Sequence, residues 1–270
     1  MRKELQHKID AAIRLLKAYD NPEQPMEIAY SGGKDSDVIL QLAKEAGINY
    51  RAIYKNTTID PPGTIKHAEE MGVEIVRPKQ TFAQLIAKKG LPNRRRRFCC
   101  EVLKEYKILD KCVQGIRRDE SPKRAARYKE PSACRIYGND NHVEQVLPIL
   151  EWSTLDVAEF LQDRKIKCAP RYYDEQGKFH PERRLGCIGC PLAARNHRLA
   201  EFRAYPGMVK LYINACKRFF EIHPNSKTVR TNKDVYAYFA RDVFYDGKPL
   251  KDLFNTDWKQ ALENYFNIKL

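Results

Sequence analysis

A short loop rich in small, polar and basic residues could bind an anion. It lies between an apolar run over residues 26–30 and an amphipathic run over residues 38–43, which predicts a strand, a turn and a helix. Glycines let the backbone approach a ligand closely, and the unpaired N–H groups at a helix start favour negative charge. We therefore predict a phosphate site made by Ser31, Gly32, Gly33, Lys34, Asp35 and Ser36.

An ordinary turn followed by a helix cap is the structural alternative for this loop. A Gly-Gly turn capped by serine or aspartate explains Gly32, Gly33 and Ser36, but it gives no role to Ser31 or Lys34. The loop also differs from a Walker A loop, which needs four residues between its first glycine and its Gly-Lys pair. The phosphate site is therefore our preferred interpretation.

Four of the eight cysteines form two close pairs, Cys99-Cys100 and Cys187-x-x-Cys190. A Cys-x-x-Cys turn aims two thiolates at one centre, although the same spacing also serves redox dithiols. Zinc sites normally space their ligands by two or more residues, so the adjacent pair is unusual for zinc. The remaining cysteines are expected to be small apolar core residues: Cys112, Cys134, Cys168 and Cys216.

The chain is basic, with 49 lysines and arginines against 35 acidic residues and a formal net charge of +14. This excess favours an anionic partner such as a nucleotide or a nucleic acid. The basic residues cluster at positions 94–97 and again at positions 117–124. A solvated face without any ligand explains the first cluster equally well.

The periodicity of apolar residues predicts strands alternating with helices. We expect helices over residues 3–19, 38–46 and 64–72, strands over residues 26–30, 50–54, 73–76 and 146–149, and a further helix capped by Ser153 and Asp156. Such βαβ units form a parallel sheet that binds ligands at the carboxyl ends of its strands. Asn56 and Thr57 follow the second strand, where they could contact a base or ribose or form an ordinary polar loop.

At 270 residues, the chain is long enough for one sizeable domain and an appendage. We expect an α/β nucleotide-binding domain over residues 1–165, and a Cys-x-x-Cys segment with a helical C-terminal region over residues 166–270. The N-terminus lacks a signal-peptide core, and no apolar run approaches the roughly 18 residues of a membrane span. We therefore expect a cytoplasmic protein with no membrane partner.

The loop at residues 31–36 resembles the PP-loop of the ATP pyrophosphatase superfamily, whose members bind ATP or an adenylyl nucleotide and usually break the α–β phosphate bond. Residues 94–104 and 115–124 resemble the phosphoadenosine phosphosulfate (PAPS) reductase branch. In that branch, a Cys-Cys pair precedes a lysine, and a Gly-Ile-Arg-Arg-like run binds anionic substrate. The resemblance covers about residues 25–192.

The resemblance implies an adenine nucleotide alpha hydrolase-like fold, which is a parallel twisted sheet flanked by helices, here with a helical C-terminal appendage. It implies nucleotide contacts from Arg117 and Arg118, beside those expected from Asn56 and Thr57. The loop would act catalytically through Lys34 and Asp35, with Mg²⁺ also stabilising charge on the phosphates.

The two cysteine pairs together resemble the four-thiolate [4Fe-4S] site of adenylylsulfate (APS) reductases and of iron–sulfur proteins that make DNA phosphorothioates. This resemblance implies a [4Fe-4S] cluster whose ligands are Cys99, Cys100, Cys187 and Cys190. Zinc, or no metal, is the alternative that the residues leave open.

The function that we expect is adenylylation of an acceptor by ATP with Mg²⁺, followed by iron–sulfur-assisted sulfur transfer. The implied partners are an adenine nucleotide, a nucleic acid (DNA or tRNA) and a sulfur donor protein such as a cysteine desulfurase. Reduction of PAPS or APS is the first alternative, although residues 263–270 lack the cysteine-containing tail of that family. A nucleotide-binding module without chemistry is the second.

Overall fold

The computed structural model describes residues 1–137, 141–248 and 255–270, which divide into two units. Three pieces of chain make up the first unit: Met1–Asn56, Pro61–Arg77 and Glu105–Gly186. The second unit consists of Thr57–Asp60, Pro78–Lys104 and Cys187–Leu270. Because both units are discontinuous in sequence, they do not test the division into residues 1–165 and 166–270, which stays a prediction.

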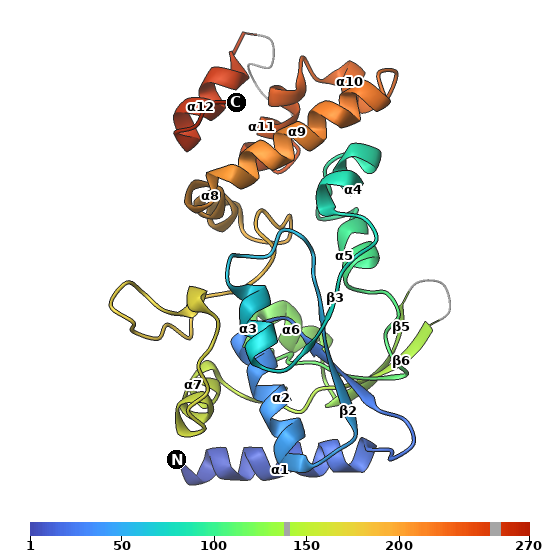
Figure 1. Cartoon of the computed structure of the whole chain (residues 1–270), viewed down its shortest axis with the longest axis vertical. Helices are drawn as coiled ribbons and strands as arrows, with labels where there is room; N and C mark the ends of the chain where they lie inside the picture. Colours follow the sequence, from blue (N-terminus) through green and yellow to red (C-terminus); the bar gives the residue numbers. More distant parts are fainter. Residues whose placement is uncertain (138–140, 249–254) are drawn as a thin grey trace. The chain divides into compact units, whose positions relative to one another are not determined.

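A six-stranded sheet organises the first unit (Figure 1). The strands, in spatial order, are β3 (Glu74–Val76), β2 (Tyr50–Lys55), β1 (Met26–Tyr30), β4 (Lys111–Val113), β6 (Asn141–Val146) and β5 (Ser132–Tyr137). All neighbours pair parallel except β5, which forms an antiparallel hairpin with β6. The central strands β1 and β4 therefore end at the same edge, where parallel sheets bind ligands.

Helices flank this sheet, and the longer ones bury apolar residues. The helices of the first unit are α1 (Lys3–Tyr19), α2 (Lys34–Ala46), α3 (Thr64–Glu70), α6 (Pro122–Arg127) and α7 (Thr154–Asp163). On α1, the buried residues recur every three or four positions, at Leu5, Ile9, Ala12 and Leu16. α1 and α7 both pack against α2, which packs on β1 (Figure 1).

A buried carboxylate fastens α1 to the start of α7. The backbone N–H of Asp156 donates to Ser153 Oγ at 3.1 Å, and the N–H of Ser153 donates to Asp156 Oδ2 at 2.8 Å, so the predicted capping box is confirmed. Asp156 is only 1% exposed and pairs with Arg2 at 2.6 Å and Lys8 at 2.8 Å. Burial opposes its ionisation, but hydrogen bonds from Lys8, Ser153 and Arg2 lower the pKa of Asp156 to about 2.

The second unit is helical and has an aromatic core. Its helices are α4 (Phe82–Lys89), α5 (Phe98–Leu103), α8 (Arg195–Ala204), α9 (Pro206–Ile222), α10 (Lys227–Thr231), α11 (Val235–Tyr245) and α12 (Trp258–Phe266). α9 packs against α4, α8 and α11. The Phe202 ring contacts the rings of Tyr212, Phe239 and Phe266, with centroids 5.1, 5.7 and 6.1 Å away. The predicted helical C-terminal region is therefore present.

The α/β fold class predicted from the sequence is confirmed, but one predicted strand is wrong. Residues 146–149 were expected to be a strand, whereas β6 ends at Val146. Pro148 has no N–H to donate to a ladder, and the chain turns instead, with Leu150 N donating to Leu147 O at 3.2 Å. Within the described ranges, every helix is too short or too polar to cross a lipid bilayer.

The buried carboxylate makes stability depend on pH. Asp156→Asn should lower the free energy of unfolding at neutral pH by about 1.5–3 kcal/mol, the range for hydrogen bonds to a charged group. The folded pKa lies near 2 and the ordinary value is 3.8, so this stabilisation is present above pH 3.8 and is lost as the pH falls toward 2. Urea titrations of the unaltered protein and of Asp156→Asn should show the difference between their free energies of unfolding shrink as the pH falls through this range.

The control is Glu159→Gln, which removes a more accessible carboxylate that also pairs with Arg2. It should change stability little, because exposed ion pairs contribute little. Equal losses for the two variants at neutral pH would contradict the role given to Asp156.

Candidate functional site

A cleft of about 480 Å³ opens in the first unit beside the loop that follows β1. This volume lies in the range of about 300–1,000 Å³ that is typical of small-molecule sites. The segment after β4 and residues 181–185 line it as well. Five of the six predicted loop residues line the cleft: Ser31, Gly33, Lys34, Asp35 and Ser36.

The two glycines shape the loop. Gly32 has φ = +76°, and a Cβ there would lie 2.5 Å from Thr64 Cγ2, so a larger residue would be strained and would clash. Gly33 is the N-cap of α2, and its carbonyl accepts from Ser36 N at 2.8 Å and from Ser36 Oγ at 2.6 Å. The loop is thus held tightly by its own backbone, with the start of α2 at the cleft.

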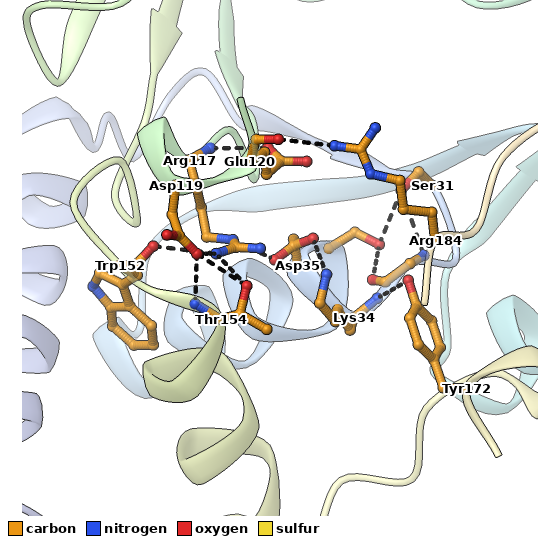
Figure 2. Close-up of polar contacts among 12 residues, drawn as sticks. Ser31, Lys34, Asp35, Arg117, Asp119, Glu120, Trp152, Thr154, Tyr172 and Arg184 are labelled. Carbon is orange, nitrogen blue, oxygen red and sulfur yellow. Dashed lines mark hydrogen bonds and ion pairs between the residues drawn. The ribbon is translucent and has the colours of Figure 1, made fainter. Parts of the chain in front are cut away.

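Tyr172, in a 3₁₀ turn over Pro170–Tyr172, also fixes the start of α2 (Figure 2). Its hydroxyl accepts the N–H of Lys34 at 3.2 Å. Burial raises the pKa of Tyr172, so its hydroxyl stays protonated. A Cβ on Gly33 would lie 3.3 Å from this hydroxyl, so a side chain at position 33 would crowd the tyrosine.

The carboxylate of Asp35 bridges two buried cations, as Figure 2 shows. Lys34 Nζ lies 2.9 Å from Asp35 Oδ2, and Arg117 Nε lies 2.7 Å from Asp35 Oδ1. Lys34 is 5% exposed and Arg117 is 1% exposed. Buried charges need partners, so Asp35 fixes the direction of both side chains.

Arg117 is occupied by protein acceptors beyond Asp35. Its Nη1 lies 3.2 Å from Asp119 Oδ2, 3.2 Å from the Trp152 carbonyl and 3.4 Å from Thr154 Oγ1 (Figure 2). Hydrogen bonds from Thr154 and the charge of Arg117 lower the pKa of Asp119. Arg117 therefore ties the segment after β4 to α2 and α7, and its predicted contact with a nucleotide stays a prediction.

Gly115 lets that segment approach α2. A Cβ at this position would lie 2.8 Å from the carbonyl oxygen of Asp35 and 3.0 Å from its carbonyl carbon. These are backbone atoms, which cannot move aside as a flexible side chain can. The glycine thereby allows Arg117 to reach Asp35.

Two further arginines line the cleft, Arg124 and Arg184. Both are joined to Glu120: Arg124 through an ion pair with its carboxylate, and Arg184 through a hydrogen bond of 3.1 Å to its carbonyl. Burial and the nearby charge of Arg184 lower the pKa of Arg124. Sequence reasoning placed Arg124 in a basic run but missed Arg184 and Tyr172, which lie in loops without a local motif.

Three predicted nucleotide contacts do not line this cleft. The Arg118 guanidinium donates to the carbonyls of Tyr128 and Lys129 and pairs with Glu151. Asn56 is buried, with its N–H donating to Val76 O at 3.0 Å. Thr57 belongs to the second unit. The nucleotide-binding roles of Arg118, Asn56 and Thr57 stay predictions.

The second unit brings four cysteine side chains to one small cavity, which Lys104 and Tyr212 also line. The cysteines are Cys99, Cys100, Cys187 and Cys190. Gly189 makes the Cys-x-x-Cys turn possible, because it has φ = +74° and a Cβ there would lie 2.3 Å from the Phe202 ring. The turn is closed by Cys190 N, which donates to Cys187 O at 3.2 Å.

Burial keeps one of these thiols, that of Cys187, protonated. It raises the pKa of Cys187, an effect that the charge of Lys104 opposes. Hydrogen bonding to Cys100, burial and the other thiols raise the pKa of Cys99. In turn, Cys187 and Asp60 raise the pKa of Lys104, which stays cationic.

These thiols do not form a ready-made site for a metal ion among the described residues. In the part of the chain that the structure describes, no group of three or more histidine, cysteine, aspartate or glutamate side chains is placed to hold one metal ion. This arrangement of side chains therefore shows neither a zinc site nor a cluster site.

Comparison with known proteins identifies a family and distant relatives. Residues 25–193 match the family model of the phosphoadenosine phosphosulfate reductase domain. The protein MJ0066 of Methanocaldococcus jannaschii is 29% identical over 232 residues. The match covers 78% of this chain and 46% of the length of MJ0066. MJ0973 of the same organism is 27% identical over 226 residues, covering 77% and 52%. The chain thus spans about half the length of these curated relatives.

Two solved structures are similar to part of the chain at low identity. Candida glabrata FMN adenylyltransferase, solved with FMN and the ATP analogue AMPCPP, has a TM-score of 0.45 and 16% identity, covering 63% of this chain and 60% of its own. The PAPS reductase of Candida auris, solved as a phosphate complex, has a TM-score of 0.41 and 13% identity, covering 63% and 90%. Similarity at this level carries no inference about the site.

The family match covers more than half of the chain and includes the glycine loop, the Cys-Cys pair and the Cys-x-x-Cys turn. The fold agrees with it, since the loop lies at the end of a central strand of a mostly parallel sheet. The chain therefore belongs to the phosphoadenosine phosphosulfate reductase domain family of PP-loop nucleotide-binding proteins.

Proposed function

We propose that the chain binds ATP with Mg²⁺ in the first cleft and transfers the adenylyl group to an acceptor, which then receives sulfur. An acceptor oxygen would attack the α-phosphorus, and pyrophosphate would leave. A sulfur nucleophile would then displace AMP from the adenylylated acceptor. The observation that carries this proposal is the cleft itself, in which a PP-loop, the N-terminus of α2 and Lys34 face one space of nucleotide size.

Charge in the cleft suits a nucleotide with a metal ion. Lys34 and the N–H groups of the loop would stabilise negative charge on the phosphates, with Asp35 holding Lys34 in place. Arg124 and Arg184 offer further positive charge. Mg²⁺ is usually held by one or two carboxylates together with substrate phosphates, and Asp119 is an ionised carboxylate in the cleft lining.

We assign the four cysteines of the second unit to a [4Fe-4S] cluster. The donor set supports this, because four thiols line one cavity beside Lys104, whose charge would offset that of thiolates. The Cys-Cys pair and the Cys-x-x-Cys turn would each supply two thiolate ligands. When bound, the cluster would hold or relay the sulfur to be transferred.

Sulfonucleotide reduction is the alternative function, and it needs a cysteine nucleophile outside the cluster. Cys216 is fully buried between α9 and α11, and burial raises its pKa. Burial likewise raises the pKa of Cys112 to about 12 and raises that of Cys168. A protonated, buried thiol is a poor nucleophile. Cys134 is exposed, but it does not line the cleft that contains the PP-loop, so sulfur transfer is favoured.

The acceptor in this proposal is a nucleic acid, DNA or tRNA, and the sulfur donor is a protein such as a cysteine desulfurase. The basic composition supports the first partner. A cytoplasmic setting is proposed because unpaired thiols persist under reducing conditions.

Loss of the Lys34 ammonium should weaken ATP binding. Hydrogen bonds to charged groups contribute about 1.5–3 kcal/mol, so Lys34→Gln should lower the affinity for MgATP by roughly 10- to 150-fold in a calorimetric titration. Lys44→Gln removes the same charge from an exposed position on the same helix and should have no effect. Unchanged affinity in Lys34→Gln would refute the loop assignment.

Removal of one cluster ligand should remove the cluster. Protein purified without oxygen should contain iron and acid-labile sulfide and show the broad visible absorbance of an iron–sulfur protein, and Cys187→Ala should lose all three. Cys134→Ala, at an exposed cysteine outside the cavity, should keep them. Zinc without iron or sulfide in the unaltered protein would contradict the cluster assignment.

The reaction products distinguish the three functions. With MgATP and DNA or tRNA, the protein should release pyrophosphate, and with PAPS or APS and a thiol donor it should release no sulfite. Sulfite release would restore the reductase. Tight ATP binding without pyrophosphate or sulfite would favour the module without chemistry.

A further inference from the structure

A second, larger cleft of about 670 Å³ lies within the second unit. Its described lining carries six basic and two acidic side chains, a formal excess of four positive charges. The basic residues are Arg94, Arg95, Arg96, Arg198, Arg241 and Lys248, and the acidic ones are Asp242 and Asp246. Neither the PP-loop nor the cluster ligands form part of it, so the proposed chemistry leaves this cleft unexplained.

A buried guanidinium at this cleft has an unused hydrogen-bond donor. Arg198 is 3% exposed, donates through Nη2 to the Asp242 carbonyl, and lies 3.5 Å from Asp242 Oδ2 and 3.9 Å from Asp246 Oδ1. Its Nε has no hydrogen-bond partner among the residues that the structure describes. The two aspartates hold this guanidinium at the lining of the cleft, where its charge adds to the positive potential that an anion would meet.

Arg241 repeats this arrangement on the same cleft. Its Nε is also buried without an acceptor in the described part of the chain, and its guanidinium lies 5.7 Å from the centre of the Tyr238 ring. Two arginines that line one cleft favour a ligand with several acceptor oxygens, which is the chemistry of phosphate.

Hydrogen bonds between side chains and backbone groups hold the arginine run at one side of the cleft in place. Asn93 Oδ1 accepts the N–H groups of Arg95 at 3.0 Å and Arg96 at 2.9 Å. Arg94 and Arg96 each donate to a backbone carbonyl, of Ala193 and Lys89 respectively, both at 3.0 Å. The loop is therefore ordered before any ligand arrives, and the exposed Arg95 side chain extends from it.

The cleft suits phosphates more than bases. Tyr238 is the one aromatic residue of the described lining, and it is 6% exposed, with its hydroxyl accepting the Leu91 N–H at 2.8 Å. It therefore offers little ring surface for a base to stack on. Cations contributed by several separate segments instead match a series of phosphates along a backbone.

We propose that this basic cleft binds the phosphodiester backbone of a nucleic acid. The inference rests on the proposed function in one respect, that the acceptor of sulfur is a nucleic acid. Binding here depends on charge and not on base sequence, so the cleft would position the acceptor and leave selection of the modified base or phosphate to other contacts.

The test is a salt series of fluorescence anisotropy with labelled duplex DNA in one arm and labelled tRNA in the other. Neutralising up to about four phosphates predicts a log–log slope approaching about −3.6 for duplex DNA, and a shallower slope for single-stranded segments. Arg95→Ala combined with Lys248→Ala should flatten the slope by about 1 for each phosphate that the variant no longer neutralises. Both positions are exposed, so the variant should fold.

The matched control is Lys210→Ala combined with Arg218→Ala, two exposed positions on α9 that remove the same charges outside the cleft lining. It should keep the slope and affinity of the unaltered protein. Absence of salt-dependent binding to both nucleic acids, or equal effects of the two double variants, would overturn the proposal.

Failure of this inference can be told apart from failure of the proposed function. ATP binding that depends on Lys34, without binding of either nucleic acid, would overturn only the basic cleft. Nucleic-acid binding that depends on Arg95 and Lys248, without any ATP binding, would overturn the proposed function and leave the cleft assignment intact.

Discussion

The first unit depends on the carboxylate of Asp35, which lies between Lys34 and Arg117. Two buried cations this close would be strongly unfavourable without a shared anion. Through Arg117, the same carboxylate is linked to the Trp152 carbonyl at the start of α7. One charge network therefore holds three segments together: the glycine loop, the segment after β4 and the start of α7. The cleft is preorganised by these ion pairs, which are already present in the protein.

The cysteine cavity of the second unit is apolar, in contrast to the charged cleft of the first unit. Its thiols lie in an apolar pocket, where burial raises the pKa of Cys187 and Lys104 is the one cationic residue of the described lining. Such a pocket disfavours thiolates, whereas bound iron would stabilise them strongly. Occupancy by a metal cluster would thus change the protonation of the pocket as well as its contents. The first unit is thus organised by its own charges, whereas the proposed cluster would add positive charge to the second.

Local signals explain what could be predicted from the sequence. A few neighbouring residues determine each of three features: the loop at residues 31–36, the apolar stripe of α1 and the capping box at Ser153. The structure contains all three. Tyr172 and Arg184 reach the cleft from loops far along the chain, with no motif to mark them. β4 has three residues, too few for a periodic pattern, and the antiparallel hairpin of β5 and β6 has no counterpart in a βαβ pattern.

The packing of α4 against α9 has a consequence for biosynthesis. α4 carries the apolar residues Phe82, Leu85 and Ile86, which belong to the core of the second unit. Their partner α9 begins at Pro206, so the ribosome completes it only after the whole of the first unit has been made. During this interval the nascent chain must keep an apolar surface uncovered in its middle, with the attendant risk of aggregation. Contacts of such long sequence separation also slow folding, so this unit should be the last to form and the one most in need of chaperones during translation.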